Sequence, residues 1–309
     1  MRILFMGTPE FAVPCLSALI KSGHQVCGVV TQPDKPVGRG HKLTPPPVKV
    51  LALENNLEVF QPESLKDFAI KKELEQLNPE MIVVVAYGKI LPEYILNYPK
   101  YGCVNIHASL LPKFRGAGPI QWSVINGEEK TGITSMLMEK GLDTGDMLLK
   151  VETEIGEYET SGELHDRLML MGAKLLLDTI DLAEEGKLRP EKQNDEYATY
   201  APMLSKETAK IDWSKPAKTV AKLISGMNPW PVAHTLYKGE ILKIYRAVVL
   251  GKAKGKCGEI LSAGSDGMEV VCGDGNLILA TEVQFSGSKR MHVRDYLNGH
   301  SIEKGEILH

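Results

Sequence analysis

The first third of the chain alternates short apolar runs with amphipathic segments. Residues 2 to 6 and 25 to 31 are largely apolar and predict buried strands. Between them, one face of a helix is predicted by the apolar residues Phe11, Leu16, Leu19 and Ile20. A strand, a helix and a strand within about 30 residues form a right-handed crossover unit. The pattern therefore predicts an α/β protein with a Rossmann-like parallel sheet that has helices on both faces.

This alternation continues to about residue 182. The uninterrupted run at residues 81 to 86 predicts a strand buried on both faces. A second strand is predicted at residues 101 to 107, because Val104 and Ile106 alternate there with Asn105 and His107. We expect helices at 65–77, 119–126 and 164–182, and strands at 131–138 and 146–155.

The pattern changes after a polar stretch at residues 189 to 202, which we interpret as a linker. A helix is expected at 216–225, and closely spaced strands are expected at 232–237, 241–250, 258–262, 267–271 and 277–285. Such strands predict a small OB-like β-barrel, a common scaffold for nucleic-acid binding. We therefore expect an N-terminal catalytic domain at 1–189, a linker at 190–206 and a C-terminal domain at 207–309.

Composition adds a charge asymmetry to this picture. The chain has 309 residues, 43% of them hydrophobic and 24% charged, which is ordinary for a globular protein of one or two domains. Its net charge of -3 argues against a polyanion-binding surface over the whole molecule. Residues 206 to 309, however, hold 15 Lys and Arg against 11 Asp and Glu, a balance of +4, and the rest of the chain has 21 against 28, a balance of -7. The C-terminal third is the better candidate for contacting a phosphate backbone, although +4 alone is unremarkable.

The cysteines, the N-terminal residues and the lengths of the apolar runs argue against a disulfide-rich, zinc-binding, secreted or membrane-spanning protein. Five cysteines without a C-x-x-C pair argue against a disulfide framework and a zinc cluster, so we expect buried thiols. The N-terminus has no signal-peptide pattern, and no apolar run approaches the roughly 18 residues of a membrane span. We therefore expect a cytoplasmic protein that does not bind a membrane.

Polar residues near the ends of the predicted strands are the candidates for chemistry. Asn105 and His107 would point to the same side of one strand, because side chains two positions apart share a face. Asp143 lies 36 positions after His107, in a loop between glycines that another loop can approach closely. A lone histidine is more often structural, but an amide, an imidazole and a carboxylate together can polarise a carbonyl, move a proton and orient the imidazole.

A nicotinamide-dependent dehydrogenase is disfavoured. The first turn of the predicted sheet is Gly7-Thr8-Pro9-Glu10 rather than G-x-G-x-x-G. Pro9 has no amide donor, and Glu10 would repel a pyrophosphate.

The polar segment from residue 32 to 47 is longer than the usual connection in such a fold. Glycines separate its basic residues, so the pattern predicts a flexible basic hairpin that could reach the end of a nucleic-acid strand. These residues are Lys35, Arg39, His41 and Lys42. A solvated surface loop is the alternative interpretation.

Several motifs resemble a known family. Asn105, His107, the run Ser109-Leu110-Leu111-Pro112 and the pair Leu142-Asp143 resemble the signature of the formyltransferases that use formyltetrahydrofolate. The segments 7–12 and 31–40, and the run Asn228-Pro229-Trp230-Pro231, resemble the members of that family that act on methionyl-tRNA. The resemblance covers almost the whole chain, without a departure at the three candidate catalytic residues.

The resemblance implies a reaction and roles for residues. The formyl group of 10-formyltetrahydrofolate, as cosubstrate, would pass to the free amino group of initiator methionyl-tRNA, giving N-formylmethionyl-tRNA for translation initiation, without a metal. Asn105 and a protonated His107 would stabilise the oxyanion, and Asp143 would hold the imidazolium and help to relay a proton.

The resemblance also implies binding residues. The pterin would be cradled by backbone groups around Lys89, Ile90 and Leu91 and by the loop of Ser109, Leu110, Leu111 and Pro112, with Leu91 and Leu110 as apolar walls. The basic hairpin would read the acceptor stem of the tRNA. We expect the protein to act as a monomer.

Two other functions stay open at the level of sequence. One is a sister formyltransferase that acts on a small amine, such as a glycinamide ribonucleotide or an amino sugar. The basic hairpin and the C-terminal barrel would have no role in such an enzyme. The other is a non-catalytic RNA-binding protein, which the intact set of Asn105, His107 and Asp143 disfavours.

Overall fold

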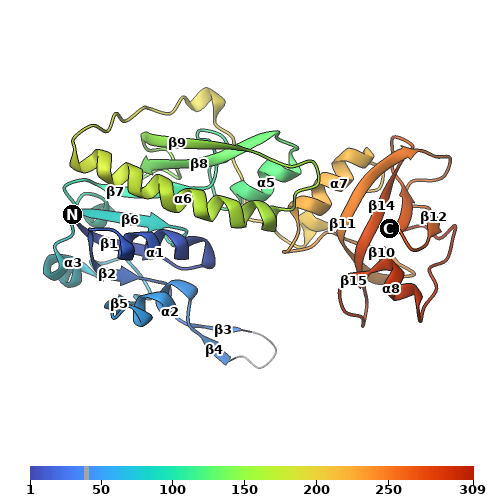
Figure 1. Ribbon diagram of the computed structural model, residues 1–309, viewed down its shortest axis with the longest axis horizontal. Helices are drawn as coiled ribbons and strands as arrows, with labels where there is room; N and C mark the ends of the chain where they lie inside the picture. Colours follow the sequence, from blue (N-terminus) through green and yellow to red (C-terminus); the bar gives the residue numbers. More distant parts are fainter. Residues whose placement is uncertain (38–41) are drawn as a thin grey trace. The chain divides into compact units, whose positions relative to one another are not determined.

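The structure, a computed structural model, describes residues 1–37 and 42–309 (Figure 1). Its residues form two compact units. The first comprises residues 1–116, 132–153 and 165–200, and the second comprises residues 117–131, 154–164 and 201–309. The domain boundaries expected at residues 189 and 206 stay a prediction.

A seven-stranded sheet in the order β5-β2-β1-β6-β7-β8-β9 forms the centre of the first unit. The pairs from β5 to β7 are parallel, whereas β8 runs antiparallel to β7. The strands are β1 Arg2–Gly7, β2 Gln25–Val30, β5 Val59–Phe60, β6 Met81–Val85, β7 Cys103–His107, β8 Lys130–Leu137 and β9 Met147–Glu154. The strand order reverses between β1 and β6, which makes this the topological switch point of the sheet. In open α/β sheets, ligands bind beside such a switch point, at the carboxyl ends of the strands. The predicted α/β class is confirmed.

The two faces of this sheet bury alternate residues of each strand. Leu4 of β1 pairs with Ile82 of β6, and both pack in one cluster with Leu74 of α3 (Lys71–Leu77) and Ile95 of α4 (Glu93–Leu96). On β7, Ile106 has the opposite parity to Cys103, which belongs to that cluster. These strands therefore use both faces for the core, as their uninterrupted apolar runs predict.

The helices α1 (Val13–Lys21) and α6 (Ser161–Glu184) cover the face to which Ile106 points (Figure 1). Gly172 of α6 makes the close packing possible. A Cβ at this glycine would lie 3.1 Å from Cγ2 of Ile106 and 3.9 Å from Sγ of Cys15. The apolar stripe predicted for α6 is buried, with Leu168 and Ile180 at 0% exposure.

Some element boundaries differ from the predictions for local physical reasons. The helix expected at 65–77 begins only at Lys71, because Asp67 and Phe68 have φ angles of 53° and 58°, which no α-helix accommodates. Helix α6 begins earlier than expected, because Thr160 and Glu163 form a capping box. In it the Thr160 N–H donates to Oε2 of Glu163 at 2.9 Å, and the Glu163 N–H donates to Oγ1 of Thr160 at 3.2 Å. The sequence interpretation missed the short β5 and the helix α2 (Pro47–Glu54).

The basic segment contains a hairpin, as predicted. Strands β3 (Lys35–Val37) and β4 (Lys42–Thr44) pair antiparallel, with Lys35 opposite Thr44. Arg39 and His41 lie outside the described residues.

The second unit is built around an antiparallel sheet, as expected for an OB-like barrel. Its strands follow the order β10-β11-β14-β13-β12, with β15 pairing with β14. They are β10 His234–Tyr237, β11 Glu240–Lys252, β12 Ile260–Ala263, β13 Met268–Val271, β14 Asn276–Phe285 and β15 Met291–His292. Helix α7 (Ala217–Gly226) contributes Val220 and Ile224 to the buried core over this sheet. This unit also contains α5 (Pro119–Ile125) and α8 (Val293–Leu297).

The cysteines only partly match the expectation. All five are free thiols, so the predicted absence of a disulfide framework agrees with the structure. Burial raises the pKa of the Cys15 and Cys103 thiols to about 12. Cys272 is also buried and Cys27 is half-buried, but Cys257 lies in a turn and is exposed, so the expectation of buried thiols is wrong for Cys257. In the described part of the chain, no helix has both the length and the apolar character that a membrane crossing requires.

A pH-dependent contribution to stability is expected from Glu163 and its partner Arg246. Partial burial raises the pKa of Glu163, but the Thr160 N–H and the Arg246 guanidinium lower it, and the net value is about 2. Both side chains are half exposed, so Glu163→Gln should lower the free energy of unfolding by less than about 1 kcal/mol at pH 7. A depressed pKa stabilises above the unfolded value of 4.5, so this difference should fade as the pH falls from 4.5 towards 2.

Urea unfolding at pH 7 and at pH 3 measures the Glu163 contribution. Arg246→Gln should give a similar loss at pH 7, and the double variant should lose little more, because both changes remove one ion pair. Fully additive losses would mean that the two side chains act separately.

Candidate active site

Strand β7 holds two of the predicted catalytic side chains. Asn105 pairs with Val84 of β6 and with Met136 of β8, and His107 lies opposite Thr134 of β8. Asn105 is half-buried and His107 is only 6% exposed. The alternation of β7 places both side chains on the same face of the sheet. They lie near the edge formed by the carboxyl ends of β6 and β7.

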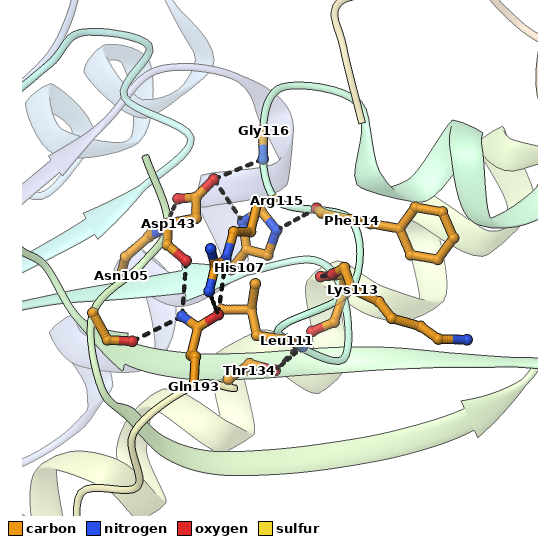
Figure 2. Close-up of polar contacts among 12 residues, drawn as sticks. Asn105, His107, Leu111, Lys113, Phe114, Arg115, Gly116, Thr134, Asp143 and Gln193 are labelled. Atoms are coloured by element: carbon orange, nitrogen blue, oxygen red, sulfur yellow. Dashed lines mark hydrogen bonds and ion pairs between the residues drawn. The ribbon is translucent and has the colours of Figure 1, made fainter. Parts of the chain in front are cut away.

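Asp143 reaches this edge from the loop between β8 and β9. Its φ of 53° lies in the left-handed region, and the loop folds back so tightly that a Cβ at Gly145 would lie 1.9 Å from the Leu137 carbonyl oxygen. Oδ2 of Asp143 accepts the Gly116 N–H at 2.8 Å, and Oδ1 lies 3.5 Å from Nδ2 of Asn105. The fold thus brings Asn105, His107 and Asp143 together, although 38 positions separate the first from the last (Figure 2).

The imidazole of His107 is anchored by a carbonyl group. Its Nε2 lies 2.9 Å from the Phe114 carbonyl oxygen, and since a carbonyl only accepts, Nε2 must carry a proton. Its Nδ1 lies 3.8 Å from Oδ2 of Asp143, which is within ion-pair range but too long for a hydrogen bond. Phe114, which the sequence did not single out, therefore fixes the ring, and Asp143 supplies charge beside the other nitrogen.

The loop after β7 is held by hydrogen bonds to its own backbone and to β8. Oγ of Ser109 donates to the Lys113 carbonyl at 2.6 Å, and Oγ1 of Thr134 donates to the Ser109 carbonyl at 2.7 Å. Leu111 is buried with Met136 and Met147, whereas Leu110 and Pro112 are half-buried. The Ser109 hydroxyl and the Leu111 side chain thus serve the fold, and Leu110 has part of its side chain at the surface.

The loop after β6 contains the other predicted folate-binding residues. Nζ of Lys89 donates to the Pro62 and Glu63 carbonyls, each at 2.7 Å, so this ammonium group ties two segments together. Ile90 is 86% exposed. Leu91 is buried in the core cluster on the α3 and α4 side of the sheet, so its side chain is not available as an apolar wall.

The base of the basic hairpin contacts the loop after β6. Nζ of Lys35 donates to Oε1 of Gln32 at 2.9 Å, and Nε2 of Gln32 donates to the Tyr87 carbonyl at 3.0 Å. The side chains of Lys35 and Lys42 are both exposed. The described part of the hairpin therefore begins next to the candidate site.

The sequence interpretation missed Gln193, which contacts the Asp143 loop, and Arg115, which contacts Gln193. Gln193 donates through Nε2 to the carbonyls of Asp143 and Gly145, each at 2.8 Å. Arg115 is 2% exposed and donates to Oε1 of Gln193 through Nε at 3.0 Å and Nη2 at 2.8 Å. Burial lowers the pKa of Arg115, but hydrogen bonds to Asp195 and Tyr200 raise it above its ordinary value. The only sequence signal was an arginine inside the motif after His107, since Gln193 lies in the segment interpreted as a linker.

Comparisons with known proteins show the family to which this chain belongs. The family model for formyl transferase matches residues 1–180, and the model for the formyl transferase C-terminal domain matches residues 203–301. A methionyl-tRNA formyltransferase of Alkaliphilus oremlandii is 55% identical over 309 residues, covering 100% of this chain and 99% of that protein. One of Caldanaerobacter subterraneus is 53% identical over 309 residues, covering 100% of both chains.

A solved structure shares the fold. The N-formyltransferase of Helicobacter canadensis, in complex with folinic acid and dTDP-3-aminofucose, has a TM-score of 0.66 at 18% identity. The match covers 90% of this chain and 98% of that one. The resemblance stated from the sequence motifs is thereby confirmed over both units. This chain belongs to the formyl transferase family and, within it, to the methionyl-tRNA formyltransferases.

Proposed function

We propose that the protein transfers the formyl group of 10-formyltetrahydrofolate to the amino group of methionine on initiator tRNA. The observation that carries this proposal is the convergence of Asn105, His107 and Asp143 at one sheet edge. The relatives that match the whole chain are named for the same transfer. The product, N-formylmethionyl-tRNA, serves translation initiation.

Asn105 is proposed to stabilise the charge that develops on the formyl oxygen. As the methionine nitrogen bonds to the formyl carbon, electron density moves to that oxygen, and an N–H donor directed at the oxygen stabilises it. The contact between Nδ2 of Asn105 and Asp143 is long, at 3.5 Å, so this amide can turn its N–H groups to a ligand at little cost. A donor of this kind contributes roughly 3 kcal/mol to the stability of a transition state.

His107 and Asp143 are proposed to act as a pair. The Phe114 carbonyl occupies Nε2 of His107, so Nδ1 is the ring nitrogen that can meet the reactants. A protonated Nδ1 would donate to the same formyl oxygen, and the Asp143 carboxylate 3.8 Å away would stabilise its positive charge. The methionine nitrogen must lose a proton and the departing folate nitrogen must gain one, and His107 and Asp143 are proposed to relay it.

The folate cosubstrate, when bound, supplies an activated formyl group. We propose that it lies between the loop of Lys89, Ile90 and Leu91 and the loop of residues 109 to 112. Both loops follow strands whose carboxyl ends are neighbours, at the edge where open sheets bind ligands. The exposed side chain of Ile90 and the half-buried Leu110 would contact the flat pterin, and backbone groups would hold its polar edge. The reaction in this form needs no metal.

The tRNA is proposed to contact the basic hairpin and the C-terminal unit. Lys35 and Lys42 are exposed at the two ends of the hairpin, and we assign Arg39 and His41 the same role from the sequence. The C-terminal third carries the positive balance of charge. The monomeric state and the cytoplasmic location stay predictions.

One assay tests the proposed function against its alternatives. The protein is incubated with 10-formyltetrahydrofolate and either methionyl-tRNA or a small amine, namely a glycinamide ribonucleotide or an amino sugar. We expect formylation of methionyl-tRNA alone. Formylation of a small amine would indicate the sister activity, and tRNA binding without any transfer would indicate a non-catalytic RNA-binding protein.

A further inference from the structure

We infer that Gln193 is a positioning residue for Asp143, and that the buried Arg115 orients Gln193. This inference rests on the proposed function, because it assigns to these two side chains a part in the same formyl transfer. Neither side chain needs to touch a reactant. Asn105, His107 and Asp143 are called the triad below. Figure 2 shows Arg115 and Gln193 beside it, and Gln193 is hydrogen-bonded both to Arg115 and to the Asp143 carbonyl.

The backbone of Asp143 is held in an unusual conformation. A non-glycine residue at a φ of 53° is in a sparsely populated region, and such a conformation persists only where its surroundings impose it. Nε2 of Gln193 donates to the carbonyls of Asp143 and Gly145, each at 2.8 Å. One amide group therefore holds both ends of this turn, and the direction of the Asp143 side chain follows from the backbone that it holds.

Arg115 fixes the orientation of the Gln193 amide. Its oxygen accepts two N–H groups from Arg115, at 3.0 Å and 2.8 Å, so its nitrogen must point to the loop. Arg115 cannot turn away easily, because it is 2% exposed and also donates to Oδ1 of Asp195 at 2.7 Å. The fork of the guanidinium thus selects the one amide orientation that clamps the loop.

The segment that contains Arg115 also holds the side chain of Asp143. The residue after Arg115 is Gly116, whose N–H donates to Oδ2 of Asp143 at 2.8 Å. The same oxygen lies 3.8 Å from Nδ1 of His107. The segment of Arg115 and Gly116 therefore acts on Asp143 in two ways. Gly116 holds the Asp143 carboxylate directly, and Arg115 holds the Asp143 backbone through Gln193. A displacement of about 1 Å at a reacting group can cost roughly 100-fold in rate.

Two variants of Gln193 separate positioning from a merely structural role. Gln193→Ala removes both donors to the loop and the acceptor for Arg115. Gln193→Glu keeps an acceptor for Arg115, so the fold should stay stable, but it loses the N–H donors and sets a carboxylate against two carbonyls. We expect both variants to lower kcat by about 10- to 100-fold, with KM for methionyl-tRNA and for the folate changed by less than about threefold. Full activity in Gln193→Glu would overturn the inference.

A matched control accounts for lost stability. Thr179 is buried in the same unit, where Oγ1 donates to the Leu175 carbonyl at 2.7 Å and lies 2.8 Å from Oγ of Ser135, whose O–H it can accept. Thr179→Val keeps the shape of the side chain and removes both hydrogen bonds, so it should lower the melting temperature without lowering kcat. An equal loss of kcat in this control would assign the Gln193 effect to stability.

A double-mutant cycle tests the route of the effect. If Gln193 acts only through Asp143, then Gln193→Ala should cost almost nothing further in an Asp143→Asn background, as measured in single turnovers. Multiplied losses would contradict the inference.

Hydrogen exchange gives a readout that does not depend on catalysis. In the free protein, Gln193→Ala should raise the exchange rate of the Gly116 amide, because its acceptor Asp143 is released. Unchanged exchange would contradict the positioning role. A wild-type protein that does not formylate methionyl-tRNA would contradict the proposed function instead and leave this readout unaffected.

Discussion

Asp143→Asn and His107→Ala are each expected to lower kcat for formyl transfer by roughly 10²- to 10⁴-fold, the range of a lost acid–base or charge-stabilising group. Asn at position 143 keeps an oxygen that can accept the Gly116 N–H, so the loop should stay in place while the negative charge beside Nδ1 of His107 is lost. Ala at position 107 removes the ring that Phe114 anchors. Rapid-quench measurement of kcat with saturating methionyl-tRNA and folate gives the result.

Ligand affinity should hardly change in these two variants, because both residues act on charge that develops during the reaction and not on groups present in the bound substrates. Asp146→Asn and His165→Ala make the same chemical changes outside the triad and should keep normal kcat. A loss of less than about tenfold in either active-site variant would remove that residue from the proposed mechanism.

Binding of methionyl-tRNA is expected to weaken by roughly 10²- to 10³-fold between 50 and 200 mM salt, because several lysine and arginine contacts to phosphates release counterions. The balance of +4 in residues 206 to 309 and the exposed lysines of the hairpin motivate this expectation. Folate affinity should change by less than about threefold, because a stacked pterin releases no condensed counterions. Titrations of both ligands at a series of salt concentrations measure the two slopes.

Single lysine variants locate the phosphate contacts. Lys42→Ala, at the start of β4, should reduce the magnitude of the tRNA slope by about one, the contribution of one phosphate contact. Lys72→Ala removes an exposed charge from α3 and should leave the slope unchanged. Equal salt slopes for tRNA and folate would contradict an electrostatic tRNA interface, and an unchanged slope in Lys42→Ala would exclude Lys42 from it.

The sequence alone determined the elements that depend on local periodicity. The uninterrupted apolar run at β6 required a strand buried on both faces, and the strict alternation in β7 required Asn105 and His107 to share a side. The antiparallel sheet of the second unit also followed from short strands separated by turn residues. These features can be predicted from the side-chain period of a strand and from turn-forming residues, because both depend only on residues that are neighbours in the sequence.

Some local features were still misread from the sequence. The helix expected from residue 65 begins at Lys71, because two left-handed residues, Asp67 and Phe68, precede it without a glycine to mark them. The capping box that starts α6 has a recognisable sequence pattern, and its hydrogen bonds appear only in the structure. Backbone angles of single residues carry a weaker signal than a repeated hydrophobic pattern.

Only the tertiary structure decided how the candidate site is held. The carboxylate of Asp143 meets Asn105 across 38 positions, and Gln193 reaches the Asp143 loop across 50. The anchor of His107 is the carbonyl of Phe114, and the clamp of Gln193 is made on the carbonyls of Asp143 and Gly145. Every residue has a backbone carbonyl, so the residue type at positions 114, 143 and 145 does not predict these contacts. They exist because the strand order of the sheet brings distant loops to one edge, where a buried arginine and a glutamine fix what the sequence pattern left undetermined.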